Sequence, residues 1–255
     1  MLLVVDVGNT QTHFGAYDGD RLVEHWRFAT VRESTADELG AALRSLLALR
    51  ALGFEDIDAS IVSSTVPQLR PEWVAMAAQY LGHEMPVVGP SLKTGMPIRI
   101  DNPRELGADR LVNAVAAYDA LGGPCVCVDL GTALTFDIVS EDGEYLGGII
   151  APGVEISMEA LTSRAAAIQK IDLEAPRSLI GKGTVDAIRS GVVYGFAAQV
   201  DGIVGRLREE LGEGLGAIAT GGLASAIVPY CESLDQVDDE LTLKGLRIIW
   251  ERNRS

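Results

Sequence analysis

Short apolar runs separated by polar turns dominate the beginning of the chain. Residues 2–7 form an almost uninterrupted apolar run that is typical of a buried strand, and residues 12–17 and 21–28 predict two more strands. The triplet Asp18-Gly19-Asp20 marks the turn between the last two. Residues 59–64 combine β-branched and small residues and predict a further strand. The pattern therefore predicts a β-meander at the start of the fold.

Helical spacing appears in the segments between these strands. Thr35 and Glu38 are spaced as a capping box, and the leucines that follow recur at helical intervals. Pro71 suits the first turn of a second helix, where its missing N–H group costs nothing. A third helix is predicted over residues 111–121. Strands followed by helices are thus the order of elements that the pattern predicts.

The strand and turn of residues 4–14 occur a second time at residues 127–137. The alignment matches Asp6 with Asp129, Gly8 with Gly131, and Thr12 with Thr135. Each copy is an apolar strand that ends in a carboxylate and is followed by a glycine turn rich in hydroxyl groups. Residues 141–143 then form a second Gly-containing turn, as residues 18–20 do in the first copy. Two copies predict a duplicated fold that holds one polyphosphate from both sides, with the boundary near residues 122–124.

The rest of the second half is predicted to be helical and is rich in small residues. We predict helices over residues 184–200 and 201–211, and a closing helix or strand over residues 241–250. Gly191 and Gly195 lie four positions apart, although glycine in a helix costs about 1 kcal/mol relative to alanine. Their spacing predicts close helix packing, within the fold or between subunits.

Composition excludes several classes of protein. The chain has 255 residues, 47% of them hydrophobic, which suffices for one large domain or two of ordinary size. No apolar run reaches the roughly 18 residues of a membrane-spanning helix, and the N-terminus lacks the basic region of a secretory signal. The net charge of −15 argues against a nucleic-acid surface, which is normally basic. We expect a cytoplasmic protein that binds neither membranes nor nucleic acids.

Cysteine usage points to the same compartment. Cys125 and Cys127 share one face of a predicted strand, and we expect them to be reduced core thiols. A metal site is less favoured, because Cys-x-Cys has no second ligand pair here and the histidines are scattered.

The segment Asp6-Val7-Gly8-Asn9-Thr10 has the composition of a phosphate-binding loop. Glycine lets the backbone approach a ligand and direct its N–H groups inward, and the side chains of Asn9, Thr10 and Thr12 add uncharged donors. Asp6 would repel phosphate unless Mg²⁺ lies between them, so a direct or water-mediated role at the metal is expected. A hairpin turn in which Asp6 caps its own backbone is the alternative, and the second copy of the motif makes it the weaker one.

Residues 102–110 form a second polar cluster, Asn-Pro-Arg-Glu-Leu-Gly-Ala-Asp-Arg. Asp109 and Arg110 at the start of a helix can form a surface ion pair, because acidic residues favour that end. Alternatively, Asp109 meets a substrate hydroxyl and Arg110 an anionic group, as phosphoryl transfer to an alcohol requires. The residues by themselves leave both interpretations open.

Two glycine-rich segments remain. Residues 147–153 predict a loop under a ligand or a tight structural turn, and residues 219–224 follow an apolar strand where backbone can pass against a flat base. Residues 181–184, Gly-Lys-Gly-Thr, do not complete a P-loop, because Pro176 occupies the place of its first glycine.

Together these residues resemble the type III pantothenate kinases of bacterial coenzyme A biosynthesis. The motifs that carry the resemblance span the chain in order: Asp6–Thr10, Asn102-Pro103, Gly107–Arg110, Asp129–Thr135, Gly147-Gly148, Pro152-Gly153, Gly183-Thr184, Thr220–Ala224 and Leu241–Leu246. The family often has Tyr where this chain has Ile100, which changes one wall of the substrate pocket.

The resemblance implies an α/β protein of the acetate and sugar kinase, heat-shock-70 and actin superfamily. That fold has two duplicated ribonuclease-H-like halves, each a mixed sheet flanked by helices, with a nucleotide cleft between them. We expect the first half over residues 1–121 and the second over residues 122–255. The segment from about residue 235 to 255 is expected to pack back on the first half.

The implied activity transfers the γ-phosphate of ATP to the terminal hydroxyl of pantothenate, with Asp109 as the proton acceptor. Cofactor binding is implied for Asp6, Val7, Gly8, Asn9, Thr10, Gln11, Thr12, His13, Gly131, Thr132, Gly221 and Gly222. Substrate binding is implied for Gly107, Ala108, Asp109, Arg110 and Thr184. Asp6 is expected near Mg²⁺ or another divalent cation, and Asp129 at a monovalent cation, K⁺ or NH₄⁺. The family's substrate site lies at a homodimer interface, so a second copy of the chain is an expected partner.

Other functions remain as alternatives. A nucleotide-binding accessory factor for transcription without kinase activity is the main one, although Asp6, Asp109 and Asp129 are all present and the negative charge argues against direct DNA contact. A sugar or small-acid kinase would share the two loops, and an actin-like filament protein would carry larger insertions.

Overall fold

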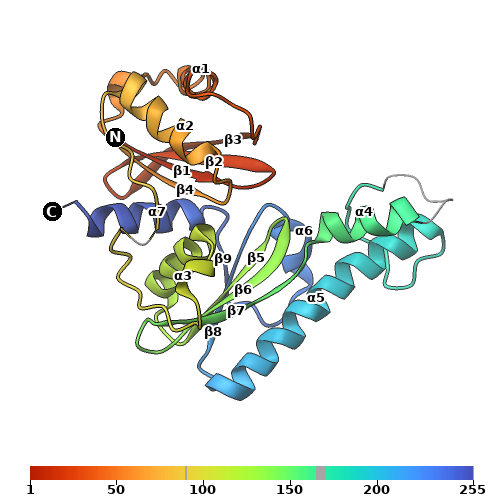
Figure 1. Cartoon of the computed structure of the whole chain (residues 1–255). Helices are drawn as coiled ribbons and strands as arrows, with labels where there is room; N and C mark the ends of the chain where they lie inside the picture. The colour runs from red at the N-terminus through yellow and green to blue at the C-terminus, as the bar shows by residue number, and fades with distance from the viewer. Residues whose placement is uncertain (90, 165–170, 255) are drawn as a thin grey trace. The chain divides into compact units, whose positions relative to one another are not determined.

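The computed structural model describes residues 1–89, 91–164 and 171–254 (Figure 1). Its packing divides the chain into two compact units. Unit 1 comprises Met1–Met96, Asp101–Ala116 and Thr242–Ser255. Unit 2 comprises Pro97–Ile100 and Ala117–Leu241. Each unit is built around its own β-sheet.

The sheet of unit 1 has four strands in the order β3-β2-β1-β4. They are β1 (Leu2–Val7), β2 (Gln11–Asp18), β3 (Arg21–Ala29) and β4 (Ala59–Ser64). The predicted meander is confirmed, since β1, β2 and β3 are antiparallel neighbours. β4 pairs with the other edge of β1 in parallel, which a crossover through helices permits.

One face of this sheet packs against α1 (Ala36–Ala48) and α2 (Leu69–Met76). The capping box predicted at the start of α1 is present: the Thr35 side chain accepts from the Glu38 backbone, and Glu38 accepts from the Thr35 N–H at 2.9 Å. α2 begins at Leu69, so Pro71 lies in its first turn, as predicted. The buried side chains of this core include Val5, Leu43 and Trp73.

The opposite face of the sheet meets α7 (Leu241–Arg252), and α7 meets the start of α3 (Ala108–Leu121). A Cβ on Gly15 of β2 would lie 3.0 Å from the Leu243 side chain. The Arg247 guanidinium lies 5.8 Å from the ring centre of Tyr17. Thr242 donates to Asn113 of α3 at 2.7 Å. The closing segment of the chain is thus a helix that belongs to unit 1.

The sheet of unit 2 has five strands in the order β7-β6-β5-β8-β9. They are β5 (Cys125–Leu130), β6 (Ala133–Val139), β7 (Tyr145–Pro152), β8 (Gly216–Thr220) and β9 (Gln236–Val237). The α-helices that lie wholly in this unit are α4 (Val154–Arg164), α5 (Thr184–Leu211) and α6 (Ala224–Ile227). Short helical turns occur in both units, at η1 (Phe54–Asp56), η2 (Ala77–Leu81), η3 (Pro103–Glu105) and η4 (Val228–Tyr230).

The structure corrects two predictions about unit 2. Residues 147–152, predicted as a loop or turn, are part of β7, where Gly147 and Gly148 pair with Ile138 and Asp137 of β6. Both glycines stay within the strand, and Gly147, whose φ is +146°, lies beside a register irregularity at Ile138 where that conformation favours glycine. Residues 184–211, predicted as two helices, form one helix. The buried side chains Phe196, Val200 and Val204 follow one another at helical spacing across the expected break.

The duplication is visible in both sheets, and the registers refine it. Asp6 pairs with His13 and Ser63 on its two neighbouring strands, and Asp129 pairs with Thr135 and Thr220. The equivalent of Thr135 is therefore His13 and not Thr12, which corrects the gap-free alignment. The reason is loop length: three residues separate β1 from β2, and two separate β5 from β6.

The cysteines are free thiols, and Cys125 and Cys127 are buried, as predicted. Burial raises the pKa of Cys125 to about 12. Within the described part of the chain, no helix has the length and apolar character needed to cross a membrane.

Candidate active site

The loop after β1 is held in a narrow conformation within unit 1. The Gly8 N–H donates to the carbonyl of Gln11 at 3.0 Å, and a Cβ on Gly8 would lie 2.9 Å from that oxygen. Thr30 donates its backbone N–H to the carbonyl of Thr10 at 2.9 Å. The requirement for glycine at position 8 therefore follows from the closeness of the two loop ends.

A row of polar side chains crosses the unit 1 sheet at the end of β1. Arg27, His13, Asp6 and Ser63 follow one another in register on β3, β2, β1 and β4. Residues in register share a face of the sheet, so these four side chains lie on the face opposite the α1 and α2 core. The tertiary fold thus gathers around Asp6 residues that are far apart in the sequence.

His13 is uncharged in this row. Burial, followed by the charges of Arg27 and His25, lowers the pKa of His13 from 6.5 to about 3. Its Nε2 lies 3.1 Å from Nδ1 of His25 in a hydrogen bond. At neutral pH His13 is therefore a neutral hydrogen-bonding group beside Asp6 and not a cation.

Two arginines that the sequence did not single out lie beside this loop. Arg32 donates to Oδ1 of Asn9 at 3.2 Å. Arg70, in the first turn of α2, donates from Nη2 to the carbonyl of Ser64 at 2.8 Å. Ser64 pairs with Val7 at the end of β1. Since β4 reaches β1 only through a crossover, sequence spacing gave no signal for Arg70.

The predicted substrate cluster is brought together on the first turn of α3 in unit 1. Gly107 precedes the helix and accepts a hydrogen bond from the Leu111 N–H at 3.1 Å. A Cβ on Gly107 would lie 2.5 Å from Oδ1 of Asp109, so only glycine leaves room for this carboxylate. Ala108 and Arg110 flank Asp109 on the same turn.

The carboxyl group of Asp109 has an unusual protonation equilibrium. Burial raises its pKa, and the backbone N–H groups of Arg110 and Asp109 together with the Arg110 charge oppose the rise. The net result is a pKa above the ordinary Asp value. A carboxylate with a raised pKa is a stronger proton acceptor than a solvated one.

The second loop surrounds Asp129 in unit 2. Gly131 donates its N–H to the Ala133 carbonyl at 3.1 Å, and its Cβ would lie 3.1 Å from Oδ1 of Asp129. Gly221 has a φ of +104°, and a Cβ there would lie 2.5 Å from the same Oδ1. A Cβ on Gly153 would collide with the carbonyls of Gly131 and Thr132. Three glycines thus allow three segments to meet around Asp129 and its loop.

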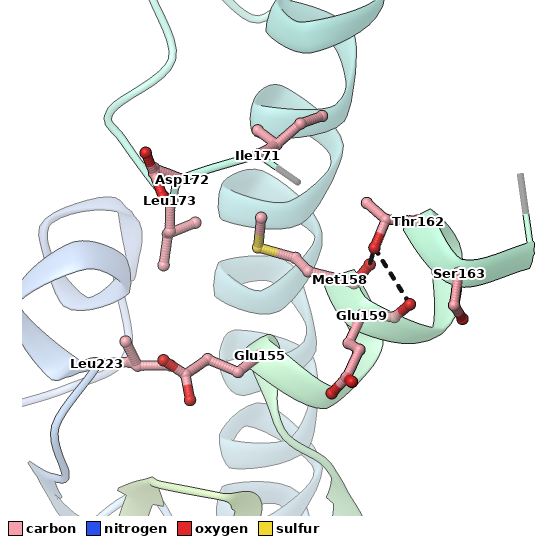
Figure 2. A pocket seen from close by; sticks show the side chains of 9 residues that line it. All are labelled: Glu155, Met158, Glu159, Thr162, Ser163, Ile171, Asp172, Leu173 and Leu223. Carbon is pink, nitrogen blue, oxygen red and sulfur yellow. Dashed lines mark hydrogen bonds between the residues drawn. The ribbon is translucent and has the colours of Figure 1, made fainter. Parts of the chain in front are cut away.

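A hollow of about 680 Å³ in unit 2 includes Leu223, which follows Gly221-Gly222. Figure 2 shows its lining side chains: Glu155 points toward Leu223, and Met158 points toward Ile171. The Leu223 N–H donates to the Leu130 carbonyl at 3.2 Å, which ties this end of the hollow to the Asp129 loop. The predicted base-contacting segment therefore borders a space of a size suited to a small ligand.

Thr184 lies elsewhere in unit 2, at the first residue of α5. It lines a groove of about 660 Å³ between α4 and α5. The other lining residues are mainly apolar or small: Ser157, Leu161, Ala187, Ile188, Gly191, Val192, Gly195, Phe196 and Gln199. Gly191 and Gly195 have open space where a Cβ would be, so they do not serve close packing against the part of the chain that the structure describes.

Comparison with known proteins identifies the family. The family profile described as type III pantothenate kinase matches residues 2–206. The type III pantothenate kinase of Moorella thermoacetica is 50% identical over 253 residues, which cover 99% of this chain and 100% of that protein.

Solved structures with low identity agree on the fold. The activator of 2-hydroxyisocaproyl-CoA dehydratase from Clostridium difficile, with bound ADPNP, matches with a TM-score of 0.58 at 12% identity, covering 99% of this chain and 96% of that one. A Campylobacter jejuni protein assigned to the Baf family of transcriptional activators matches with a TM-score of 0.59 at 20% identity, covering 99% and 98%. At such identities the likeness concerns the fold, which is the actin-like fold expected from the sequence. On its sequence and fold, this chain belongs to the type III pantothenate kinase family.

Proposed function

We propose that Asp109 of this kinase accepts the proton from the terminal hydroxyl of pantothenate while the γ-phosphate of ATP is transferred to that oxygen. The observation that carries the proposal is the carboxyl group of Asp109, whose pKa is raised by burial on the first turn of α3. Proton removal makes the hydroxyl oxygen a better nucleophile, and the proton stays on the carboxylate when the new P–O bond forms.

Binding of ATP is assigned to the two glycine loops. In unit 1, residues 6–13 offer backbone N–H groups and hydroxyl side chains, and Arg32 and Arg70 supply positive charge beside them. In unit 2, Gly131 and Thr132 offer the equivalent groups, and Gly221-Gly222 contact the adenosine. The arginines explain how a chain of charge −15 receives a polyphosphate, since local cations offset the overall field.

Pantothenate is assigned to the segment 107–110 and to Thr184. Arg110 holds the anionic end of the substrate, because a guanidinium is a suitable partner for a carboxylate. Gly107 and Ala108 present little side chain and leave space beside Asp109.

The oxygen donors fit the two cations that we propose. Among the described residues, no cluster of three or more His, Cys, Asp or Glu side chains could hold a metal ion. Mg²⁺ needs only one or two carboxylates when it binds together with nucleotide phosphates, so Asp6 suffices. Gly131 and Gly221 both approach the Asp129 carboxylate closely, and this carboxylate would supply a hard oxygen donor of the kind that suits K⁺ or NH₄⁺. Both cations would offset phosphate charge when bound.

ADP release measured with and without pantothenate tests this function, in the presence and absence of K⁺. We expect release that depends on pantothenate and rises with K⁺. We expect Asp129→Asn to lose most of the K⁺ activation, because an amide brings no charge, while Asp142→Asn in the exposed β6–β7 turn retains it. No pantothenate-dependent release under any condition would contradict the kinase function for this chain. Equal K⁺ activation in Asp129→Asn would remove only the cation role.

We also propose that a second copy of the chain binds along the α4–α5 groove. Leu161 and Val185 are each 45% exposed beside it, and Gly191 and Gly195 leave room for a close approach of another helix. Burying such apolar surface favours association. Thr184 at the same groove then places substrate binding next to the subunit contact.

Replacing Gly195 with Glu should dissociate this dimer. A charged side chain would enter the apolar groove, and we expect a monomer by light scattering at micromolar concentration, with the KM for pantothenate raised at least tenfold. Gly205→Glu is the matched control, because Gly205 lies on the same helix with equally open space but outside the groove. A Gly195→Glu chain with the mass of the wild type would place the interface elsewhere.

A further inference from the structure

The hydroxyl of Ser63 is a buried polar group that has no hydrogen-bond partner among the residues that the structure describes. Ser63 lies on β4 with 0% of its surface exposed, and its Oγ has no partner in the structure. A buried hydroxyl that leaves its hydrogen bond unmade lowers the stability of the fold. Its neighbour Ser64 is equally buried, but its Oγ bonds to both the carbonyl and the N–H of Val66. Of these two neighbouring serines, Ser63 is thus the one whose hydroxyl lacks a partner among the described residues.

The position of Ser63 shows which group its hydroxyl can reach. It pairs in parallel register with Asp6, so the two side chains lie side by side on one face of the sheet. Neighbours in register have Cβ atoms about 5 Å apart, which brings a serine hydroxyl within reach of the carboxylate or of a water bound to it. Ser64 points to the other face, toward the α1 and α2 core.

The duplicated half of the chain repeats this arrangement. Thr220 pairs in parallel register with Asp129 and is 2% exposed. Both strand-end carboxylates thus have a buried hydroxyl residue beside them on the parallel strand. The remaining neighbours differ, since His13 stands beside Asp6 where Thr135 stands beside Asp129. A hydroxyl in this place is shared by both halves.

We propose that Ser63 is a positioning residue of the first phosphate loop, whose hydroxyl forms its hydrogen bond at Asp6 only when ATP and its divalent cation are bound. This inference rests on the proposed role of Asp6 in nucleotide binding. The Asp6 carboxylate would hold the cation, and the Ser63 hydroxyl would fix the orientation of that carboxylate or of a water bound to it. The cost of the unmade hydrogen bond in the free protein is then recovered on binding.

The test compares Ser63→Ala with Ser64→Ala and Ser63→Thr. Without ligand, Ser63→Ala should melt at or above the wild-type temperature, because it removes an unpaired hydroxyl. Ser64→Ala should melt lower, because it breaks two hydrogen bonds. With Mg·ATP, Ser63→Ala should show a smaller rise in melting temperature and a KM for ATP about tenfold higher, while the KM for pantothenate is unchanged. Ser63→Thr, which places at position 63 the residue found at Thr220, should keep the wild-type rise in melting temperature and the wild-type KM for ATP.

Each other outcome decides against the inference. If Ser63→Ala lowers the melting temperature as Ser64→Ala does and keeps the wild-type response to Mg·ATP, Ser63 is a structural residue. If Ser63→Ala does not fold, Ser63→Thr and Ser63→Cys replace it, because the first keeps a hydroxyl and the second does not. An equal KM for ATP in these two variants would count against the inference. If Mg·ATP does not raise the melting temperature of the wild type, the proposed function itself is overturned. If Mg·ATP raises the melting temperatures of the wild type and of Ser63→Ala equally, only this inference is overturned.

Discussion

We expect Asp109→Asn to lower kcat by about 10²–10⁴-fold while the KM for ATP stays near the wild-type value. The amide keeps the shape of the carboxyl group and its place beside Gly107, but it cannot accept the substrate proton. The proposed ATP-binding groups are the glycine loops and not this side chain, so ATP binding should be little affected. The measurement is steady-state ADP release at saturating ATP and pantothenate, with circular dichroism to verify the fold.

The raised pKa of Asp109 predicts how both turnover and stability change with pH. Turnover of the wild type should fall as pH decreases through that pKa, above the ordinary Asp range, because only the ionised form accepts a proton. Folding favours the protonated carboxyl group, so the free energy of unfolding contributed by Asp109 decreases as pH rises through the same window. Asp109→Asn should therefore be at least as stable as the wild type at neutral pH.

Asp101→Asn is the matched control for this prediction, because Asp101 is exposed on the loop before η3. It should retain wild-type turnover and stability. Turnover of Asp109→Asn within a few fold of the wild type would exclude Asp109 as the proton acceptor. A large loss of stability in Asp109→Asn would instead indicate a structural ion pair with Arg110.

The second large effect is expected for Gly221→Ala in unit 2. Its φ of +104° disfavours any side chain, and the new Cβ would lie 2.5 Å from Oδ1 of Asp129 and 2.6 Å from the carbonyl carbon of Leu130. Strain and overpacking together cost about 2–5 kcal/mol of the free energy of unfolding. Movement of the loop to relieve this collision would also raise the KM for ATP.

Urea denaturation and ATP kinetics of Gly221→Ala and Gly222→Ala provide the comparison. Gly222 is adjacent, has no positive φ of the kind that favours glycine, and leaves open space for a Cβ. We expect Gly222→Ala to change the free energy of unfolding by less than about 1 kcal/mol. An equal free energy of unfolding and an equal KM for ATP in the two variants would show that neither stability nor ATP binding depends on the close approach of Gly221 to Asp129.

Local sequence signals predicted much of the fold of this protein. The capping box of Thr35 and Glu38 defined the start of α1, and the apolar run at residues 2–7 is β1. Such features depend on neighbours within a few positions, which the sequence displays directly. They failed at Gly147 and Gly148, which suggested a loop but lie within β7 because β7 pairs with β6.

The chemistry of the site was visible in the sequence only in part. The loops at Asp6 and Asp129 and the turn at Asp109 could be predicted, because each is one continuous segment with a recognisable composition. Arg70 and Ser63 could not, because each reaches the end of β1 only through the crossover to β4. The sequence gives no register for strands that are paired across such a distance.

The sequence by itself determined the repeated strand–loop units, the family and the identity of the carboxylates. The tertiary structure alone decided which residues stand beside them: Ser63 and the neutral His13 beside Asp6, and Gly221 beside Asp129. The physical reason is that local composition sets the conformation of a segment, whereas its neighbours, its burial and hence its pKa values depend on strand pairing and packing between distant segments.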